Sequence, residues 1–136
     1  MKRFQFNKLI RNKLPAKMLA EGVTLNSQNL CSAEYSAKLK EKILEEAKEV
    51  ASSDSVHSLT IELADLIEVI YAVAANYQIP LELIETERLK KRETNGYFDQ
   101  TTYVNYIEVP NDNNKVLEYL LSIGYSHDLE RSLVKH

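Results

Sequence analysis

Two pairs of acidic residues are the part of the sequence best suited to chemistry. Glu46 and Glu49 are three residues apart, and so are Glu62 and Asp65. On a helix this spacing places both carboxylates at neighbouring positions of the surface. Carboxylates that converge in a partly buried site repel one another unless a cation lies between them. Because Mg²⁺ prefers carboxylate and phosphate oxygens, the two pairs predict a Mg²⁺ site, with Mn²⁺ as a substitute ion.

Whether these carboxylates meet depends on how two helices pack. Apolar stripes predict one helix over residues 33–51, with Leu44 in its stripe, and another over 56–77, with Leu63 in its stripe. Around the helix axis, Glu46 and Glu62 lie about 70° from the centres of their stripes. Glu49 and Asp65 lie about 130° from them, and all four are displaced in the same rotational sense. If the helices are antiparallel neighbours, the pairs either face each other or point apart. The handedness of packing decides, and the sequence leaves both arrangements open.

The rest of the chain predicts further helices and one short strand. Pro15 fits the first turn of a helix, and a residue before proline avoids helical geometry, so residues 8–14 are expected to be extended. Residues 101–109 are rich in β-branched and aromatic residues and predict a strand. The expected fold class is therefore mainly all-α, a bundle of four or five helices with a short β segment. The helices are expected over residues 15–22, 33–51, 56–77, 80–94 and 115–123.

Length and composition indicate a single globular domain. The chain has 136 residues, of which 44% are hydrophobic and 27% charged, as in ordinary globular proteins. We expect one domain over residues 1–136. Within it we distinguish a basic N-terminal segment, a helical core and a C-terminal extension, over residues 1–14, 15–96 and 97–136.

Charge is distributed unevenly along the chain. A net charge of −3 argues against binding to a nucleic-acid polymer. Residues 1–20 contain six Lys or Arg and no acid, whereas residues 49–87 contain eight Asp or Glu and no Lys or Arg. No apolar run reaches the roughly 18 residues that cross a membrane, and the N-terminus lacks a signal-peptide core. Because the single Cys31 also suits a reducing compartment, a cytoplasmic location is expected.

Three segments resemble one enzyme superfamily. EEAKE at 45–49, followed by ELAD at 62–65, resembles the E-E-x-x-E and E-x-x-D signature of the α-helical (MazG-like) nucleoside triphosphate pyrophosphohydrolases. KLIRNKLP at 8–15 resembles the K-L-V-R-D-K-I-P opening of their phosphoribosyl-ATP pyrophosphohydrolase-like branch. KR at 91–92 with GYF at 96–98 resembles the K-R-x-x-R-G-G-F segment of that branch. The chain departs from the branch pattern at Asn12, Asn95 and Tyr97.

The resemblance implies a helical bundle, usually dimeric or larger, that holds Mg²⁺ with Glu46, Glu49, Glu62 and Asp65. It implies cleavage between the α- and β-phosphates of a (d)NTP or a non-standard nucleotide, which releases a monophosphate and pyrophosphate. Glu45 or Glu49 would orient or deprotonate the attacking water, although Glu45 is expected to point toward solvent. The residues expected to bind the phosphates of the nucleotide substrate are Lys8, Arg11, Lys13, Lys91 and Arg92.

The predicted helix over residues 56–77 is apolar nearly all round. Ile61, Val69 and Tyr71 lie outside its main stripe, and a helix of this kind is buried. One small domain has little to bury it with, so we expect a homodimer or homotetramer with this helix in the shared core.

Two other functions compete with general (d)NTP hydrolysis. One is the phosphoribosyl-ATP pyrophosphohydrolase step of histidine biosynthesis, whose dedicated enzymes tend to be shorter than this chain. The other is a non-catalytic helical regulatory module that kept the fold. Activity on the two substrate types separates the enzymes, and the module would show neither hydrolysis nor a Mg²⁺-dependent thermal shift.

Overall fold

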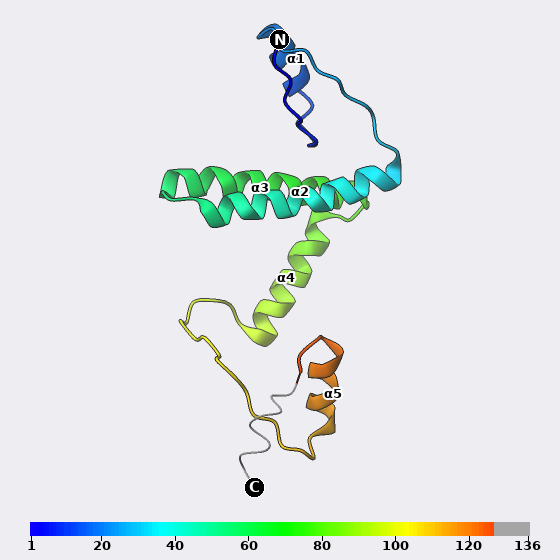
Figure 1. Ribbon diagram of the computed structural model, residues 1–136. Helices are drawn as coiled ribbons and strands as arrows, with labels where there is room; N and C mark the ends of the chain where they lie inside the picture. Colours follow the sequence, from blue (N-terminus) through cyan, green and yellow to red (C-terminus); the bar gives the residue numbers. More distant parts are fainter. Residues whose placement is uncertain (127–136) are drawn as a thin grey trace. The chain divides into compact units, whose positions relative to one another are not determined.

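The computed structural model describes residues 1–126, and this part of the chain is helical (Figure 1). It contains five α-helices and no strand within that range, so the predicted all-α class is confirmed. Each helix begins and ends within two residues of its predicted bounds. The helices are α1 (Leu14–Ala20), α2 (Ser32–Ser52), α3 (Val56–Asn76), α4 (Leu81–Asn95) and α5 (Asn114–Ser122).

The ends of α3 and α4 are set by local signals. Ser55 is the N-cap of α3, and its hydroxyl accepts a hydrogen bond from the Ser58 N–H at 3.1 Å. Such a cap satisfies one of the unpaired N–H groups of the first helical turn. Pro80 directly precedes α4, and Gly96 follows it with a φ of 79°. Glycine adopts this left-handed conformation without strain, which explains why α4 ends there.

Two local predictions are wrong. Residues 101–109, predicted as a strand, form no regular secondary structure. A strand needs a partner for its backbone N–H and C=O groups, and the described part of the chain offers none. Leu14, expected to be extended, is instead the first residue of α1, and its N–H donates to the Arg11 carbonyl at 3.1 Å. Pro15 permits this, because the N–H that proline lacks would have no partner in a first turn.

The helices α2 and α3 form an antiparallel hairpin (Figure 1), and among the described residues they are the helix pair in extensive contact. Along each helix, one line of less exposed residues recurs every three or four positions, as in the contact line of a coiled coil. We call this line the seam. It consists of Ser36, Leu39, Ile43, Glu46 and Val50 of α2, Ser53 directly after α2, and Ser58, Glu62, Leu66, Val69, Val73 and Asn76 of α3.

The chain divides into two compact units, Met1–Gly96 and the part from Tyr97 onward. The first unit contains α1 to α4, and the second contains α5. The single domain over residues 1–136 stays a prediction. None of the helices in the described residues combines the length and the apolar composition needed to cross a lipid bilayer.

Candidate metal centre

Three carboxylates meet where α2 and α3 face each other. One oxygen from each of Glu46, Glu62 and Asp65 lies within 4.8 Å of the other two. Glu46 and Glu62 are seam residues, and all three side chains are half-buried. Acidic groups between two helices lose hydration and repel one another. This arrangement therefore calls for a compensating cation.

The two acidic pairs thus face each other, which is one of the two arrangements that the sequence allows. The rotation of each helix about its own axis explains how the carboxylates meet. The predicted stripes contain Leu44 and Leu63, but these side chains are 64% and 43% exposed. The seam passes instead through Glu46 and Glu62. Glu46 and Glu62 consequently lie within the helix contact, and Asp65 lies beside it.

The donor set fits Mg²⁺. Two oxygens bound to one Mg²⁺ lie at most about 4.2 Å apart, because each bond is about 2.1 Å long. Neighbouring oxygens around an octahedral Mg²⁺ lie about 3 Å apart. The oxygens of the three carboxylates lie within 4.8 Å of one another, so side-chain movements of up to about 2 Å would bring them together on one ion. Within residues 1–126 no histidine or cysteine joins this group, which distinguishes it from the usual zinc sites. Mn²⁺ has a similar preference for carboxylates.

Both burial and the neighbouring carboxylates act on Glu62. Partial burial, together with the charges of Glu49, Asp65 and Glu46, raises its pKa above the ordinary value of 4.5. Glu49 itself is exposed and lies outside the group of three. The structure therefore brings three of the four predicted ligands together and leaves Glu49 beside them.

The raised pKa of Glu62 predicts a pH-dependent stability of the metal-free protein. The folded chain holds the proton of the Glu62 carboxyl more tightly than the unfolded chain does. The free energy of unfolding therefore falls as the pH rises from 4.5 through the raised pKa. Glu62→Gln removes the ionisation, and the metal-free variant should gain stability over the unaltered protein toward neutral pH. Thermal unfolding with a chelator, followed across this range, measures the gain. A gain that is equal at every pH would contradict the prediction.

Two cations from the N-terminal segment lie against these acidic groups. Arg11 Nη2 donates to Asp65 Oδ1 at 2.8 Å, and Lys8 Nζ lies 3.2 Å from Glu45 Oε1. Exposed ion pairs of this kind contribute little to folding stability. Their main consequence is position, because two cations predicted to bind phosphates lie beside the predicted metal ligands.

A third cation of the site, Lys42, does not stand out in the sequence motifs. Its Nζ lies 3.2 Å from Glu45 Oε1 and 3.7 Å from Glu46 Oε1. Its side chain is 21% exposed, against 47% for Lys8 and 59% for Arg11. Its position three residues before Glu45 and four before Glu46 is the signal that identifies it, since residues at these spacings are neighbours on a helix.

Glu45 lies between two lysines. The expectation that it points freely to solvent is wrong, because its carboxylate is half-buried and pairs with both Lys42 and Lys8. Burial acts to raise the pKa of Glu45, but the hydrogen bonds from these lysines outweigh burial and hold that pKa below its ordinary value. Glu45 is therefore a fixed anion that keeps two ammonium groups next to the carboxylate group of three.

The other predicted phosphate-binding residues lie at helix ends. Lys13 is the N-cap residue of α1. Lys91 and Arg92 belong to the C-terminal part of α4, where Arg92 is in the last turn. In the described part of the chain, neither Lys13 nor Lys91 forms an ion pair with the three carboxylates.

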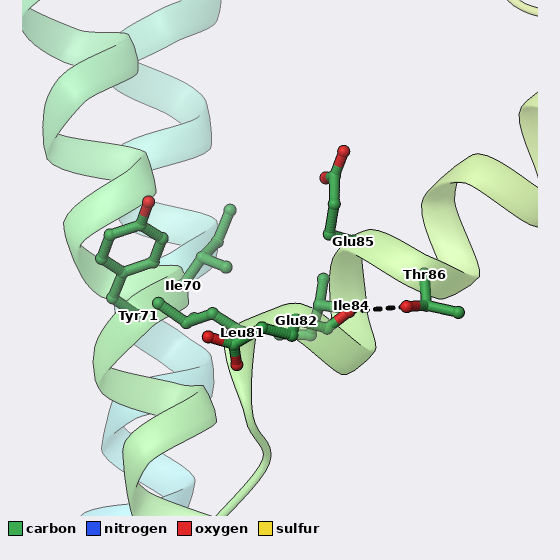
Figure 2. Close-up of a pocket in the computed structure, with 7 residues that line it drawn as sticks. All are labelled: Ile70, Tyr71, Leu81, Glu82, Ile84, Glu85 and Thr86. Carbon is green, nitrogen blue, oxygen red and sulfur yellow. Dashed lines mark hydrogen bonds between the residues drawn. The ribbon is translucent and has the colours of Figure 1, made fainter.

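A separate pocket of about 540 Å³ is formed by α3 and α4 (Figure 2). Ile70 and Tyr71 line it from α3, and Leu81 and Ile84 contribute apolar walls from α4. Its charged side chains are Glu82 and Glu85, and it has no Lys or Arg among its lining residues. An acidic pocket without cations is unsuited to phosphate, so we do not assign the nucleotide to it.

The site thus combines three carboxylates of a helix pair, two further glutamates and three cations. Comparisons of the chain with models of protein families, with curated proteins and with solved structures find no match. Chemically, the arrangement is suited to bind a divalent metal ion and, next to it, an anion.

Proposed function

We propose that the chain is a Mg²⁺-dependent nucleotide pyrophosphohydrolase, which cleaves the bond between the α- and β-phosphates of a (d)NTP. The observation that carries the proposal is the contact between the acidic group and a distant basic segment, in which Arg11 lies 2.8 Å from Asp65. A site for a metal alone needs no adjacent cations, and a site for an anion alone needs no carboxylates. A polyphosphate complexed with Mg²⁺ needs both. The resemblance of the acidic and basic motifs to the MazG-like enzymes supports the same function.

In this proposal each side chain has one role. Glu46, Glu62 and Asp65 hold Mg²⁺, which when bound polarises phosphate oxygens and lowers the pKa of water. Lys8 and Arg11 donate hydrogen bonds to phosphate oxygens and offset their charge. The residues proposed for the more distant phosphates are Lys13, Lys91 and Arg92.

Of the two candidate catalytic carboxylates, Glu49 is better suited to accept a proton from water. The lysines beside Glu45 hold its pKa below the ordinary value, and a weaker base accepts a proton less readily. Glu49 lies one helical turn from Glu46 and is exposed to solvent. We therefore assign water activation to Glu49 and the positioning of Lys8 and Lys42 to Glu45.

Pyrophosphate release from a panel of nucleotides tests the proposal. Ribo- and deoxyribonucleoside triphosphates and phosphoribosyl-ATP are compared, each with Mg²⁺ and with a chelator. Mg²⁺-dependent release from the triphosphates would support the proposed activity. A strong preference for phosphoribosyl-ATP would identify the biosynthetic enzyme instead. Absence of hydrolysis, together with an unchanged Tm in Mg²⁺, would identify a non-catalytic module.

Arg11→Gln is expected to raise KM for the preferred nucleotide by roughly 10-fold or more, because a hydrogen bond to a charged group contributes about 1.5–3 kcal/mol. Steady-state kinetics over a range of nucleotide concentrations measure the change. Arg3→Gln, which removes the same charge from the same segment, is the matched control and should leave KM unchanged. Equal effects of the two substitutions would show that only the total charge of the segment matters.

We also propose that the chain associates with a second copy of itself through one side of the α2–α3 hairpin. Because the helices are antiparallel, residues displaced from the seam in the same rotational sense lie on the same side of both. Seven apolar residues lie on one such side, and all of them are exposed. We call this the apolar face: Leu44, Ala47, Ala51, Leu59, Leu63, Ile67 and Ile70.

The single chain leaves much of its apolar surface uncovered. Among residues 1–126 the buried hydrophobic residues are Leu39 and Ala74, whereas a folded chain of this length usually buries about two-thirds of its surface. Ile70 of the apolar face also lines the pocket in Figure 2, so the uncovered apolar region extends toward α4. A second copy offers an identical face, and two-fold pairing would cover both. This supports a homodimer or homotetramer built on the apolar face.

A further inference from the structure

We infer that Lys42 binds the substrate phosphate that lies next to the metal ion, an inference that rests on the proposed function. Lys42 lies on α2 one turn before Glu46. Its Nζ is 3.2 Å from Glu45 and 3.7 Å from Glu46, so it contacts both the proposed metal ligand and the glutamate beside it. It is also the least exposed of the three cations in the site.

The charges of the site leave a place for one divalent ion. Five carboxylates stand against three cationic side chains, which leaves two formal negative charges for a divalent ion to balance. Once a carboxylate oxygen of Glu46 binds that ion, Glu46 no longer depends on Lys42 as its counter-ion. The carboxylates are Glu45, Glu46, Glu49, Glu62 and Asp65, and the cations are Lys8, Arg11 and Lys42.

Glu45 keeps the ammonium group of Lys42 in position while leaving it donors for an anion. An ammonium group carries three N–H donors, and Lys42 donates one hydrogen bond to Glu45 Oε1 at 3.2 Å. The same oxygen is 3.2 Å from Lys8 Nζ, so one carboxylate holds two ammonium groups side by side. Lysine binds phosphate as a point charge. Because Glu46 contacts Lys42 and is a proposed metal ligand, a phosphate on the metal would lie beside Lys42.

Two roles for Lys42 predict opposite effects on metal affinity. If Lys42 only kept Glu46 in place, its removal would weaken metal binding. If Lys42 binds phosphate, its removal takes a positive charge away from the metal ligands, so metal binding is kept or becomes tighter. Only in the second case does the binding of an anion with the metal become weaker while the affinity for the metal alone does not.

Isothermal titration calorimetry of Lys42→Met distinguishes the two roles. The probes are Mn²⁺ alone and inorganic pyrophosphate in the presence of Mg²⁺. We expect Mn²⁺ affinity to be unchanged or several-fold higher and pyrophosphate affinity to fall by roughly 10-fold or more, with Lys42→Arg retaining most of the pyrophosphate affinity. Lys38 lies on the preceding turn of α2 and pairs with the exposed Glu41, so Lys38→Met should leave both affinities unchanged.

Weaker Mn²⁺ binding would overturn the inference and identify a structural role, whether or not pyrophosphate binding, which depends on the metal, also becomes weaker. If the unaltered protein binds both probes and hydrolyses nucleotides while Lys42→Met binds pyrophosphate equally well, the inference fails and the proposed function stands. If the unaltered protein binds no Mn²⁺, both fail. Circular dichroism checks that each variant is folded, and Lys42→Gln replaces Lys42→Met with the same expected outcomes if the methionine variant is not.

Discussion

Glu46→Gln is expected to lower the rate of Mg²⁺-dependent pyrophosphate release by at least about 100-fold. Loss of a residue that merely supports a metal ligand costs about 10- to 100-fold, so loss of a ligand should reach at least the upper end of that range. The amide keeps the size of the side chain but removes the negative charge that faces Glu62 and Asp65 in the helix contact. Initial rates at saturating nucleotide, over a wide range of Mg²⁺ concentration, measure the loss.

Glu41→Gln is the matched control for this experiment. Glu41 lies on the same helix and is exposed, and its carboxylate pairs with Lys38 at 3.0 Å. The substitution removes the same charge from α2 but lies outside the carboxylate group, so the rate should stay at that of the unaltered protein. An undiminished rate in Glu46→Gln would contradict the assignment of Glu46 as a metal ligand. Equal losses of rate in both variants would show that the loss of a negative charge on α2, rather than the loss of a metal ligand, lowers the rate.

Leu63→Glu is expected to dissociate the assembly. Leu63 belongs to the apolar face, and two-fold pairing would bring two introduced carboxylates into the same apolar contact. An uncompensated buried charge costs several kcal/mol, and each 1.4 kcal/mol is tenfold in affinity. The dissociation constant should therefore rise by at least about 100-fold. Sedimentation equilibrium or light scattering over a range of protein concentrations measures it, and thermal unfolding should show a lower Tm.

Ile61→Glu provides a closely matched control. Ile61 and Leu63 flank Glu62 on α3 and are 47% and 43% exposed. Helical geometry places Ile61 on the side of the hairpin that carries Glu45 and Asp65, away from the apolar face. Its substitution should leave the molecular mass unchanged. An unaltered protein that sediments as a monomer at all concentrations, or equal dissociation by both variants, would contradict association through the apolar face.

The helices could be predicted because their signals are local. Ser55 marks a helix end by the hydrogen bond that its hydroxyl accepts, and Pro80 and Gly96 do so by the backbone geometry that they favour. Apolar periodicity marks the helices between these ends. The strand could not be predicted reliably from residues 101–109, because β-branched and aromatic side chains favour a strand only where a second strand accepts its backbone hydrogen bonds. That partner is a property of the whole fold, and residues 1–126 do not supply it.

The candidate site could be predicted in its residue types and only partly in its geometry. The acidic spacing identifies Glu46, Glu62 and Asp65, which do converge. Their position at the helix contact depends on how α2 and α3 rotate about their axes, and an apolar stripe does not fix that rotation when a helix has apolar residues on more than one side. The same rotation leaves Leu44 exposed.

The approach of the N-terminal segment is the least predictable part of the site. Arg11 and Asp65 are separated by 54 positions in the sequence, so no helical spacing relates them. Apart from the resemblance of residues 8–15 to a segment of the MazG-like enzymes, the signal is the charge asymmetry between the basic residues 1–20 and the acidic residues 49–87. Opposite charge predicts that such segments attract, but it does not specify which atoms meet.

Anomalous diffraction from a crystal grown with Mn²⁺ would test the metal centre most directly. We predict a peak at coordination distance from an oxygen of each of Glu46, Glu62 and Asp65, with Arg11 displaced from the Asp65 oxygen that lies 2.8 Å from its Nη2. A peak elsewhere, or no peak while these three carboxylates remain paired only with lysine and arginine, would contradict the metal centre and with it the proposed hydrolysis.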